Sequence, residues 1–224
     1  MERIKTGITG LDKKLGGGFP AGSSILLVGP PGCGKSTISQ QFLAEGLKNE
    51  EAGLYTTLDI PPEEFLENIK KFGKVNTKNL KFIDAYSWRI GNTSGDFTLT
   101  NLANINELNI MMSQIIEEIG PSKLKRSVFD SVSTLLLYAD PILVVKMMPV
   151  IIAKLKAAKF TQILILEEGV HDPKTVATLN YLTDGLIEFK MEEGKRFFRI
   201  VRMKDTDHKM DWVEFDITDQ GVQI

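Results

Sequence analysis

The chain has 224 residues, of which 42% are hydrophobic and 25% are charged, so it is long enough to bury the core of one α/β domain. Its formal net charge of -2 excludes the strongly basic field that draws many proteins to nucleic acid or anionic membranes. The single cysteine cannot form an internal disulfide, and the charged start MERIKTGITG lacks the apolar segment of a secretory signal. We therefore expect a cytoplasmic protein that has neither nucleic acid nor a membrane as its partner.

Apolar runs alternate with helix-like segments along most of the chain. The run at residues 23–29 ends in a glycine turn, and residues 35–49 follow with apolar side chains at helical spacing. The same alternation predicts further strands at residues 52–59, 79–85, 126–130 and 160–168. It predicts further helices at residues 61–73, 100–120 and 141–159. This order indicates an α/β fold with a mostly parallel sheet and helices on both faces.

The C-terminal part of the chain has a different pattern. Residues 184–224 alternate with period two and carry turn signals at EEGK and TDQG, which predicts antiparallel hairpins that extend the same sheet. Residues 86–100 show no clear period and are expected to form a mobile loop, with Thr100 or Asn101 capping the next helix. Because no linker divides the chain, we expect one domain over residues 1–224.

A glycine-rich segment lies between the first predicted strand and helix. Residues 29–36 read GPPGCGKS and match the P-loop (Walker A) pattern G-x-x-x-x-G-K-[ST] at every fixed position. Its glycines let backbone N–H groups turn toward phosphate oxygens, and the helix that follows offers its positive N-terminus. Cys33 is either a small residue that fits the loop or a thiol activated by that helix. The residues expected to bind the nucleotide here are Gly32, Cys33, Gly34, Lys35, Ser36 and Thr37.

Side chains at strand ends are expected to complete this site. Lys35 should reach the β- and γ-phosphates, and the Ser36 hydroxyl should bind Mg²⁺. Asp130 follows the apolar run RSVF, in the order behind the P-loop that is typical of a Walker B aspartate, and shares the predicted metal site with Ser36. Glu167 and Glu168 end another predicted strand and could face either the nucleotide or solvent.

The order of these motifs resembles the KaiC-like branch of the RecA superfamily of ATPases over nearly the whole chain. The segments that carry the resemblance are IKTGITGLDKKLGGGFPAGSSILLVGPPGCGKST, FDSVSTLLL, YLTDGLIEF and RMKDTDH before FDITDQG. The resemblance implies a RecA-like P-loop core that binds ATP with Mg²⁺ and forms a homo-oligomer, often a hexameric ring. In such rings the nucleotide lies between subunits. Any further protein partner is unknown.

Two departures from the family's pattern concern hydrolysis, and the first follows the second strand. There the family usually carries two adjacent glutamates, one of which activates the attacking water, whereas this chain has Asp59 and Ile60. By resemblance Asp59 is the catalytic base, but its reach is shorter by about 1.5 Å. A misplacement of about 1 Å can cost roughly 10²-fold in rate, so we expect slow turnover. Glu63 and Glu64 follow on the first turn of a helix, where they are favourable partners of the helix dipole.

The second departure lies in RMKDTDH, where the family tends to read K-x-R-G-T-x-H. Arg202 and Lys204 exchange the two cations that in the family reach the neighbour's γ-phosphate. As alternating strand residues they are expected to point to one face. Arg offers a planar fork and Lys a point charge, so the exchange is not neutral. The residues that by resemblance line the neighbour's base and ribose are Thr206, His208 and Asp219.

Two functions of different classes fit these residues. A Mg²⁺-dependent ATPase would use Asp59 to orient or deprotonate water, Lys35 to draw charge from the γ-phosphate, and Arg202 with Lys204 to complete the site in trans. A nucleotide-binding switch or scaffold with little turnover would use ATP as an assembly ligand, which the Asp-Ile pair favours. Single-stranded DNA binding is a third and weaker alternative, because stacking aromatics are confined to the loop around Trp88.

Overall fold

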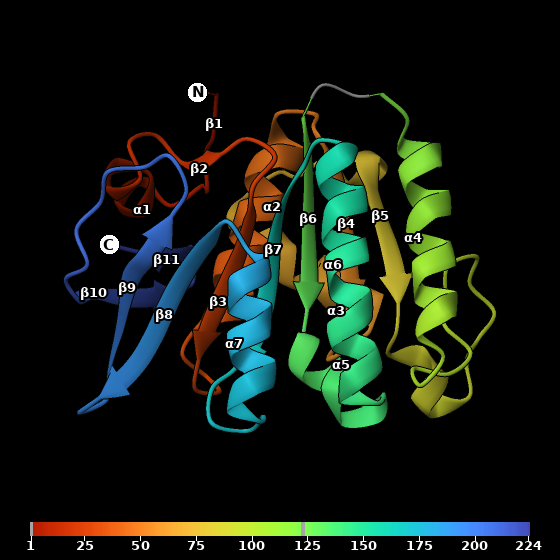
Figure 1. Ribbon diagram of the computed structural model, residues 1–224. Coiled ribbons are helices and arrows are strands. Elements are labelled where there is room, and N and C mark those ends of the chain that lie inside the picture. The colour runs from red at the N-terminus through yellow and green to blue at the C-terminus, as the bar shows by residue number, and fades with distance from the viewer. Residues whose placement is uncertain (1, 122–123) are drawn as a thin grey trace.

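The computed structural model describes residues 2–121 and 124–224. A nine-stranded sheet with strand order β11-β10-β9-β8-β3-β7-β6-β4-β5 forms its centre (Figure 1). Strands β8, β3, β7, β6, β4 and β5 are parallel, and β9, β10 and β11 continue the sheet in antiparallel fashion. The bounds are β3 Ser24–Gly29, β4 Ala52–Thr57, β5 Leu80–Asp84, β6 Lys125–Asp130, β7 Phe160–Glu167, β8 Gly185–Glu192, β9 Lys195–Met203, β10 Val213–Thr218 and β11 Gly221–Gln223. The predicted mostly parallel sheet with C-terminal antiparallel hairpins is confirmed.

Helices cover both faces of the parallel strands. α2 and α3 lie on one face and α4, α5, α6 and α7 on the other (Figure 1). The bounds are α2 Lys35–Lys48, α3 Pro62–Ile69, α4 Ile105–Ile119, α5 Val132–Tyr138, α6 Pro141–Ala157 and α7 Pro173–Leu182, with 3₁₀ turns at Lys70–Phe72, Thr77–Asn79 and Ser87–Ile90. Within the described residues, no helix combines the length and the hydrophobicity needed to cross a bilayer.

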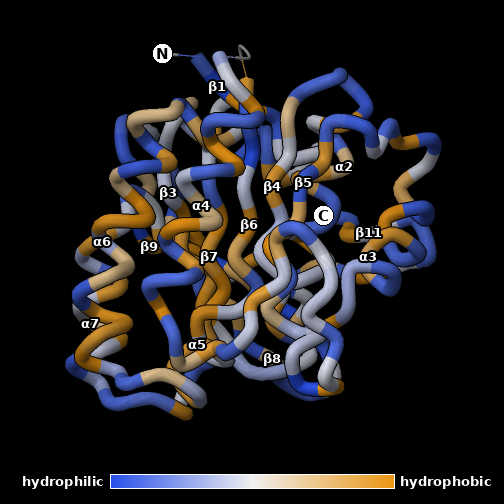
Figure 2. Tube along the Cα trace, turned by 90° about the vertical axis from the view of Figure 1, so that its right-hand side faces the viewer, coloured by the Kyte–Doolittle hydropathy of each residue, from blue (hydrophilic) through white to orange (hydrophobic). Residues whose placement is uncertain are grey.

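The two faces of the sheet build two apolar clusters. Along β3, Ile25 and Leu27 pack with α2, whereas Leu26 between them packs with the helices of the opposite face. Figure 2 shows hydrophobic residues concentrated along the central strand β7. A strand that is buried on both faces consists largely of consecutive apolar residues, and such runs are what predicted these strands from the sequence.

A short N-terminal unit flanks the antiparallel edge of the sheet. β1 (Arg3–Ile4) and β2 (Phe19–Pro20) pair antiparallel, and α1 (Thr9–Lys14) lies between them in the chain. Ile4 and Phe19 are buried in the same apolar cluster as α2. This unit therefore belongs to the core that supports the P-loop helix.

The helix expected from residue 100 begins five residues later, and the expected cap is wrong. α4 starts at Ile105. The Thr100 hydroxyl donates to Glu107 at 2.8 Å, and the Asn101 side chain accepts from the Ala103 N–H at 2.9 Å, so both residues form turns ahead of the helix. Side chains of this kind bind nearby backbone as readily in turns as at helix caps, so sequence could not separate the two outcomes.

Besides the six-residue α1, the hydrophobic periodicity did not predict the helices α5 and α7. α5 spans only Val132–Tyr138, too short for a helical period to emerge. α7 begins at Pro173, and the Asp172 carboxylate accepts from the Lys174 and Thr175 N–H groups. A capping aspartate followed by proline at the first helical position was a readable signal for this helix.

Asp184 connects the start of β8 to β3 and α6. Its carboxylate accepts from the Ser24 N–H at 3.0 Å and lies 2.9 Å from the Lys156 Nζ. Burial raises the pKa of this carboxyl, but the bonds from Lys156 and Ser24 outweigh burial and hold the pKa below its ordinary value of 3.8. The folded protein therefore favours the ionised carboxylate.

We expect Asp184→Asn to lower the free energy of unfolding by about 1–2 kcal/mol at pH 7, because bonds to a charged acceptor are weakened. Since the folded-state pKa is depressed, this stabilisation is complete above pH 3.8 and declines as the pH falls through the folded-state pKa. Urea unfolding of wild type and variant at pH 7 and pH 3 measures the difference. An equal difference at both pH values would contradict the ionised carboxylate as its source.

Candidate functional site

The P-loop joins β3 to α2 and needs glycine at two positions for steric reasons. Gly34 has φ of +102°, and a Cβ there would lie 2.6 Å from the Ile217 Cδ1 of β10. At Gly29 a Cβ would lie 2.6 Å from the Phe189 Cβ of β8. Arg196 on β9 donates from Nε to the Gly32 carbonyl at 3.3 Å. The antiparallel hairpins therefore press directly against the loop that the motif predicts to hold phosphates.

The Lys35 ammonium is buried inside this loop. Its Nζ lies 2.8 Å from the carbonyl oxygens of Gly29 and Pro30, and 2.9 Å from the Glu167 Oε2 at the end of β7. The Lys35 side chain is 3% exposed and that of Glu167 is 26% exposed. Glu167, for which the sequence left two orientations open, therefore faces the P-loop, while Glu168 is exposed.

Ser36, on the first turn of α2, meets Asp130 at the carboxyl end of β6. The Ser36 hydroxyl lies 3.3 Å from the Asp130 Oδ1, and the Tyr55 hydroxyl donates to the Asp130 Oδ2 at 2.8 Å. Burial raises the pKa of Asp130 to about 6. The nearby negative charges of Asp59 and Glu167 also raise this pKa, whereas the hydrogen bonds from the Tyr55 and Ser36 hydroxyls lower it. Burial also holds the pKa of Tyr55 well above its ordinary value, so its hydroxyl remains a donor.

These residues fit a magnesium nucleotide. Burial, and after it the charges of Asp59 and Glu167, disfavour the ionised Asp130 carboxylate, and a divalent cation beside Asp130 and the Ser36 hydroxyl would stabilise that ionised form. Among the described residues there is no group of three or more His, Cys, Asp or Glu side chains that could hold a metal unaided. Mg²⁺ commonly takes one or two protein oxygens and completes its shell with phosphate oxygens and water, which suits this pair.

Cys33 behaves as a small buried residue of the loop. It is 0% exposed, and its Sγ lies 3.5 Å from the Lys35 Nζ. Burial raises the pKa of the thiol despite the opposing charge of Lys35. The interpretation as a thiol activated by the helix N-terminus is therefore contradicted, because reactive cysteines have a depressed pKa. Thr37 follows four residues later, on the first turn of α2.

Asp59 lies just beyond the end of β4 and is exposed. Its carboxylate accepts a hydrogen bond from the hydroxyl of Thr134 on α5, and Thr134 in turn contacts the Ser131 Oγ at 3.2 Å. Ile60 packs against the apolar cluster under α2, so this position is part of the core and supplies no polar group. The single carboxylate is thus positioned by hydroxyls of α5.

A second hydroxyl of α5 links Glu167 to a histidine. The Ser133 Oγ accepts from the Glu167 N–H at 2.7 Å and lies 2.8 Å from the His171 Nε2. Burial lowers the pKa of His171, so the neutral ring is favoured. His171 follows β7 in the chain and is only partly buried, yet it has a hydrogen-bond partner in Ser133.

Arg202 and Lys204 lie at the opposite end of the sheet from their own P-loop. Arg202 is paired with Leu186 at the start of β8, and its guanidinium donates to the carbonyls of Asn180 and Thr183 at 2.7 and 2.8 Å, at the end of α7. Lys204 follows the last residue of β9 and lies in a turn. The expectation that both cations are alternating residues of one strand is therefore wrong for Lys204.

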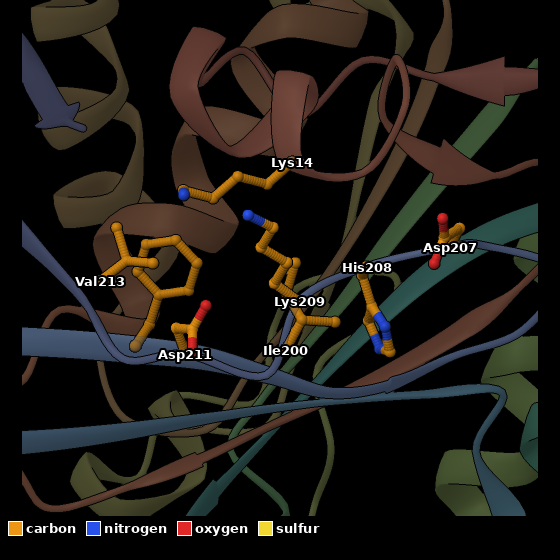
Figure 3. A pocket seen from close by; sticks show the side chains of 8 residues that line it. Lys14, Ile200, Asp207, His208, Lys209, Asp211 and Val213 are labelled. Carbon is orange, nitrogen blue, oxygen red and sulfur yellow. The ribbon is translucent and has the colours of Figure 1, made fainter.

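Thr206, His208 and Asp219, the residues expected to line the base and the ribose, lie at different places in the folded subunit. The Thr206 hydroxyl accepts from Arg3 at 2.6 Å. His208 lines a pocket of about 420 Å³, together with Lys14 and Lys209, whose side chains point toward each other (Figure 3). The His208 Nε2 is buried and has no hydrogen-bond partner among the described residues. Asp219 lies at the far end of β10, in the turn before β11.

The loop around Trp88 uses its aromatic residues internally. The Trp88 Nε1 donates to the Ala85 carbonyl at 3.0 Å, and its ring packs edge-on against Tyr138 at 5.5 Å. The Arg89 guanidinium lies between the rings of Tyr86 and Tyr138, 5.3 and 4.9 Å from their centroids. These contacts favour a packing role for Trp88 over a platform for stacked bases.

The chain is similar to known proteins over its whole length. A protein-family model described as "ATPase: KaiC" matches residues 4–224. A UPF0273 protein of Pyrococcus furiosus is 32% identical over 239 residues, covering 100% of this chain and 94% of that protein. A UPF0273 protein of Methanocaldococcus jannaschii is 32% identical over 241 residues, covering 100% of this chain and 96% of that protein.

The fold agrees with that family. The crystal structure of a KaiC-like protein from the hyperthermophilic archaeon Pyrococcus horikoshii matches with a TM-score of 0.78 at 24% sequence identity, covering 99% of this chain and 98% of that chain. The resemblance inferred from the motifs is thereby confirmed. The chain belongs to the KaiC family of ATPases and is an ATP-binding protein of the RecA superfamily.

Proposed function

We propose that this protein is a slow Mg²⁺-dependent ATPase whose nucleotide sites are completed by a neighbouring copy, with residues 1–224 acting as one domain. The observation that carries the proposal is the placement of two sets of groups. Lys35, Ser36 and Asp130 converge at one end of the sheet, and the Lys204 turn lies at the other end. In a chain built in this way, Lys204 can reach a γ-phosphate only in the site of a second copy.

The proposed reaction is attack of water on the γ-phosphorus of ATP, which yields ADP and phosphate. Lys35 stabilises charge on the transferred phosphoryl group, and Asp59 orients the water and takes its proton. Ser36 and Asp130 would hold Mg²⁺, which neutralises charge on the β- and γ-phosphates when bound. The loop amides of Gly32 to Thr37 hold the phosphates in line with the water.

Slow turnover follows from the surroundings of Asp59. Its carboxylate already accepts from Thr134, and the adjacent Ile60 packs in the core and supplies no second carboxylate. Asp59, the proposed base, therefore has no adjacent carboxylate, and its side chain is one methylene shorter than that of the glutamate usual in the family. A shortfall of this size in a phosphoryl-transfer site reduces the rate without removing nucleotide binding.

Lys204 is the cation best suited to act in trans. Arg202 already donates to two carbonyls at the end of α7. By contrast, no hydrogen bond or salt bridge of the Lys204 ammonium occurs within residues 2–121 and 124–224, and the side chain is exposed. Of the two predicted cations, we therefore assign the γ-phosphate contact to Lys204 and a structural role to Arg202.

We expect Asp59→Asn to lower the single-turnover rate of ATP hydrolysis roughly 10²-fold while ATP affinity is retained, because only the base is lost. Asp59→Glu restores the missing methylene and is expected to raise the rate roughly tenfold. Lys35→Ala should abolish both hydrolysis and tight binding. Single-turnover measurements with calorimetric titration of ATP test all three. Equal rates for wild type, Asp59→Asn and Lys35→Ala would remove the proposal.

We expect Lys204→Ala to reduce hydrolysis by about 10³-fold with no loss of stability, because a cationic finger acts on the transition state. Arg202→Ala should instead lower the free energy of unfolding by about 1 kcal/mol, since the Thr183 carbonyl loses the guanidinium as its donor, although the Asn180 carbonyl keeps its bonds from Thr183. Thermal unfolding and single-turnover rates separate the two effects.

Mixing inactive variants tests whether Lys204 acts between copies. Lys204→Ala has an intact P-loop, and Lys35→Ala still carries Lys204, so the mixture should regain activity that neither variant shows alone. Titration of one variant with the other follows the recovery. Hydrolysis that stays at the level of the separate variants, in a mixture shown by sedimentation to form mixed oligomers, contradicts a contribution in trans.

A nucleotide-binding switch with little turnover is the alternative favoured by the lone Asp59. In that case ATP would act as an assembly ligand that stabilises an oligomer. Sedimentation with ATP, with ADP and without nucleotide, alongside hydrolysis rates, separates the two functions. An ATP-dependent oligomer without hydrolysis supports the switch, and an oligomer indifferent to nucleotide argues against it.

A further inference from the structure

The ion pair between Lys35 and Glu167 occupies the point where the P-loop is expected to hold a terminal phosphate. An ammonium group has three N–H donors. Three oxygens lie within 2.9 Å of the Lys35 Nζ, two from loop carbonyls and one from the Glu167 carboxylate. A phosphate oxygen can accept a well-aligned hydrogen bond from this ammonium only if one of the three acceptors moves away or shares a Lys35 N–H group with the phosphate.

The two carbonyls are held by the backbone. The Gly29 carbonyl also accepts from the Glu168 N–H at 3.0 Å, and the Pro30 carbonyl also accepts from the Cys33 N–H at 3.4 Å. Moving either oxygen would deform the loop that binds the phosphates. The Glu167 carboxylate instead ends a rotatable, partly exposed side chain. It is the acceptor that a phosphate can replace.

The backbone keeps Glu167 close to the phosphate position even when its side chain moves. Glu167 is the register partner of Gly29 in the parallel β3–β7 pair, and its N–H donates to the Ser133 Oγ at 2.7 Å. A carboxylate anchored here carries the same sign of charge as the triphosphate. Both the competition for Lys35 and this repulsion act against the terminal phosphate.

We propose that Glu167 sets the affinity of the P-loop for polyphosphate by competing with the terminal phosphate for Lys35, a role that rests on the proposed function of the site. The ligand class is a nucleoside triphosphate or any polyphosphate long enough to reach the lysine. Glu167 thereby weakens binding, and nucleotide remains bound only where the other contacts of the site outweigh this competition.

Glu167→Gln keeps the size of the side chain and an amide oxygen for Lys35 but removes the charge. We expect this variant to bind Mg-ATP and inorganic tripolyphosphate about tenfold more tightly than wild type, measured by isothermal titration calorimetry. Tripolyphosphate lacks base and ribose, so a parallel gain assigns the effect to the phosphate end of the site.

Glu168→Gln is the matched control. It removes the same charge one residue later from an exposed side chain, so it reports the general effect of charge near the site. We expect it to change either affinity less than twofold. An equal gain in both variants, or no gain or weaker binding in Glu167→Gln, overturns the competition.

The test distinguishes failure of the inference from failure of the proposed function. If wild type binds Mg-ATP and Glu167→Gln binds it no better, only the role of Glu167 fails. If neither protein binds Mg-ATP, the proposed function fails as well. Thermal unfolding verifies that each variant is folded, and Glu167→Ala, which removes the acceptor entirely, serves as a second variant with the same expected gain.

Discussion

The arrangement of the site depends on how the buried Lys35 ammonium is paired. A buried charge without partners is costly, so the chain must supply acceptors at fixed positions around it. Two come from the loop itself, and the third, Glu167, comes from a strand more than a hundred residues later. The parallel register of β3 and β7 places Glu167 opposite Gly29, which brings this acceptor into contact with the lysine.

Two further carboxylates, Asp59 and Glu167, lie near Asp130, and hydroxyl groups contact all three residues. Tyr55 and Ser36 contact Asp130, and Thr134 holds Asp59. Ser133, next to Thr134 on the first turn of α5, fixes the backbone of Glu167. The short helix α5 therefore positions both carboxylates that flank Ser36 and Asp130, the pair proposed to bind Mg²⁺. A small displacement of α5 would move the candidate base and the competing acid together.

The two ends of the sheet have different roles in the proposed assembly. The P-loop end carries the phosphate and metal groups, whereas the start of β8 and the end of β9 carry Lys204 and the Arg202 bonds to α7. Groups that must meet but lie at opposite ends of one subunit are typical of head-to-tail contacts between copies, which close into rings when the rotation permits. The same separation explains why Asp219, at the far end of β10, is not brought near His208 in one chain.

Local patterns and their order along the chain were enough to predict the P-loop, the Asp130 strand, the parallel sheet and the terminal hairpins. Each of these is signalled by neighbouring residues, because apolar runs, glycine turns and period-two alternation report burial and backbone conformation directly. The partners of Lys35 and Asp130, the cap that Arg202 provides for α7 and the start of α4 were not accessible in this way. They depend on which distant strands and helices become neighbours and at what register, and that is settled only when the whole chain packs around a common core.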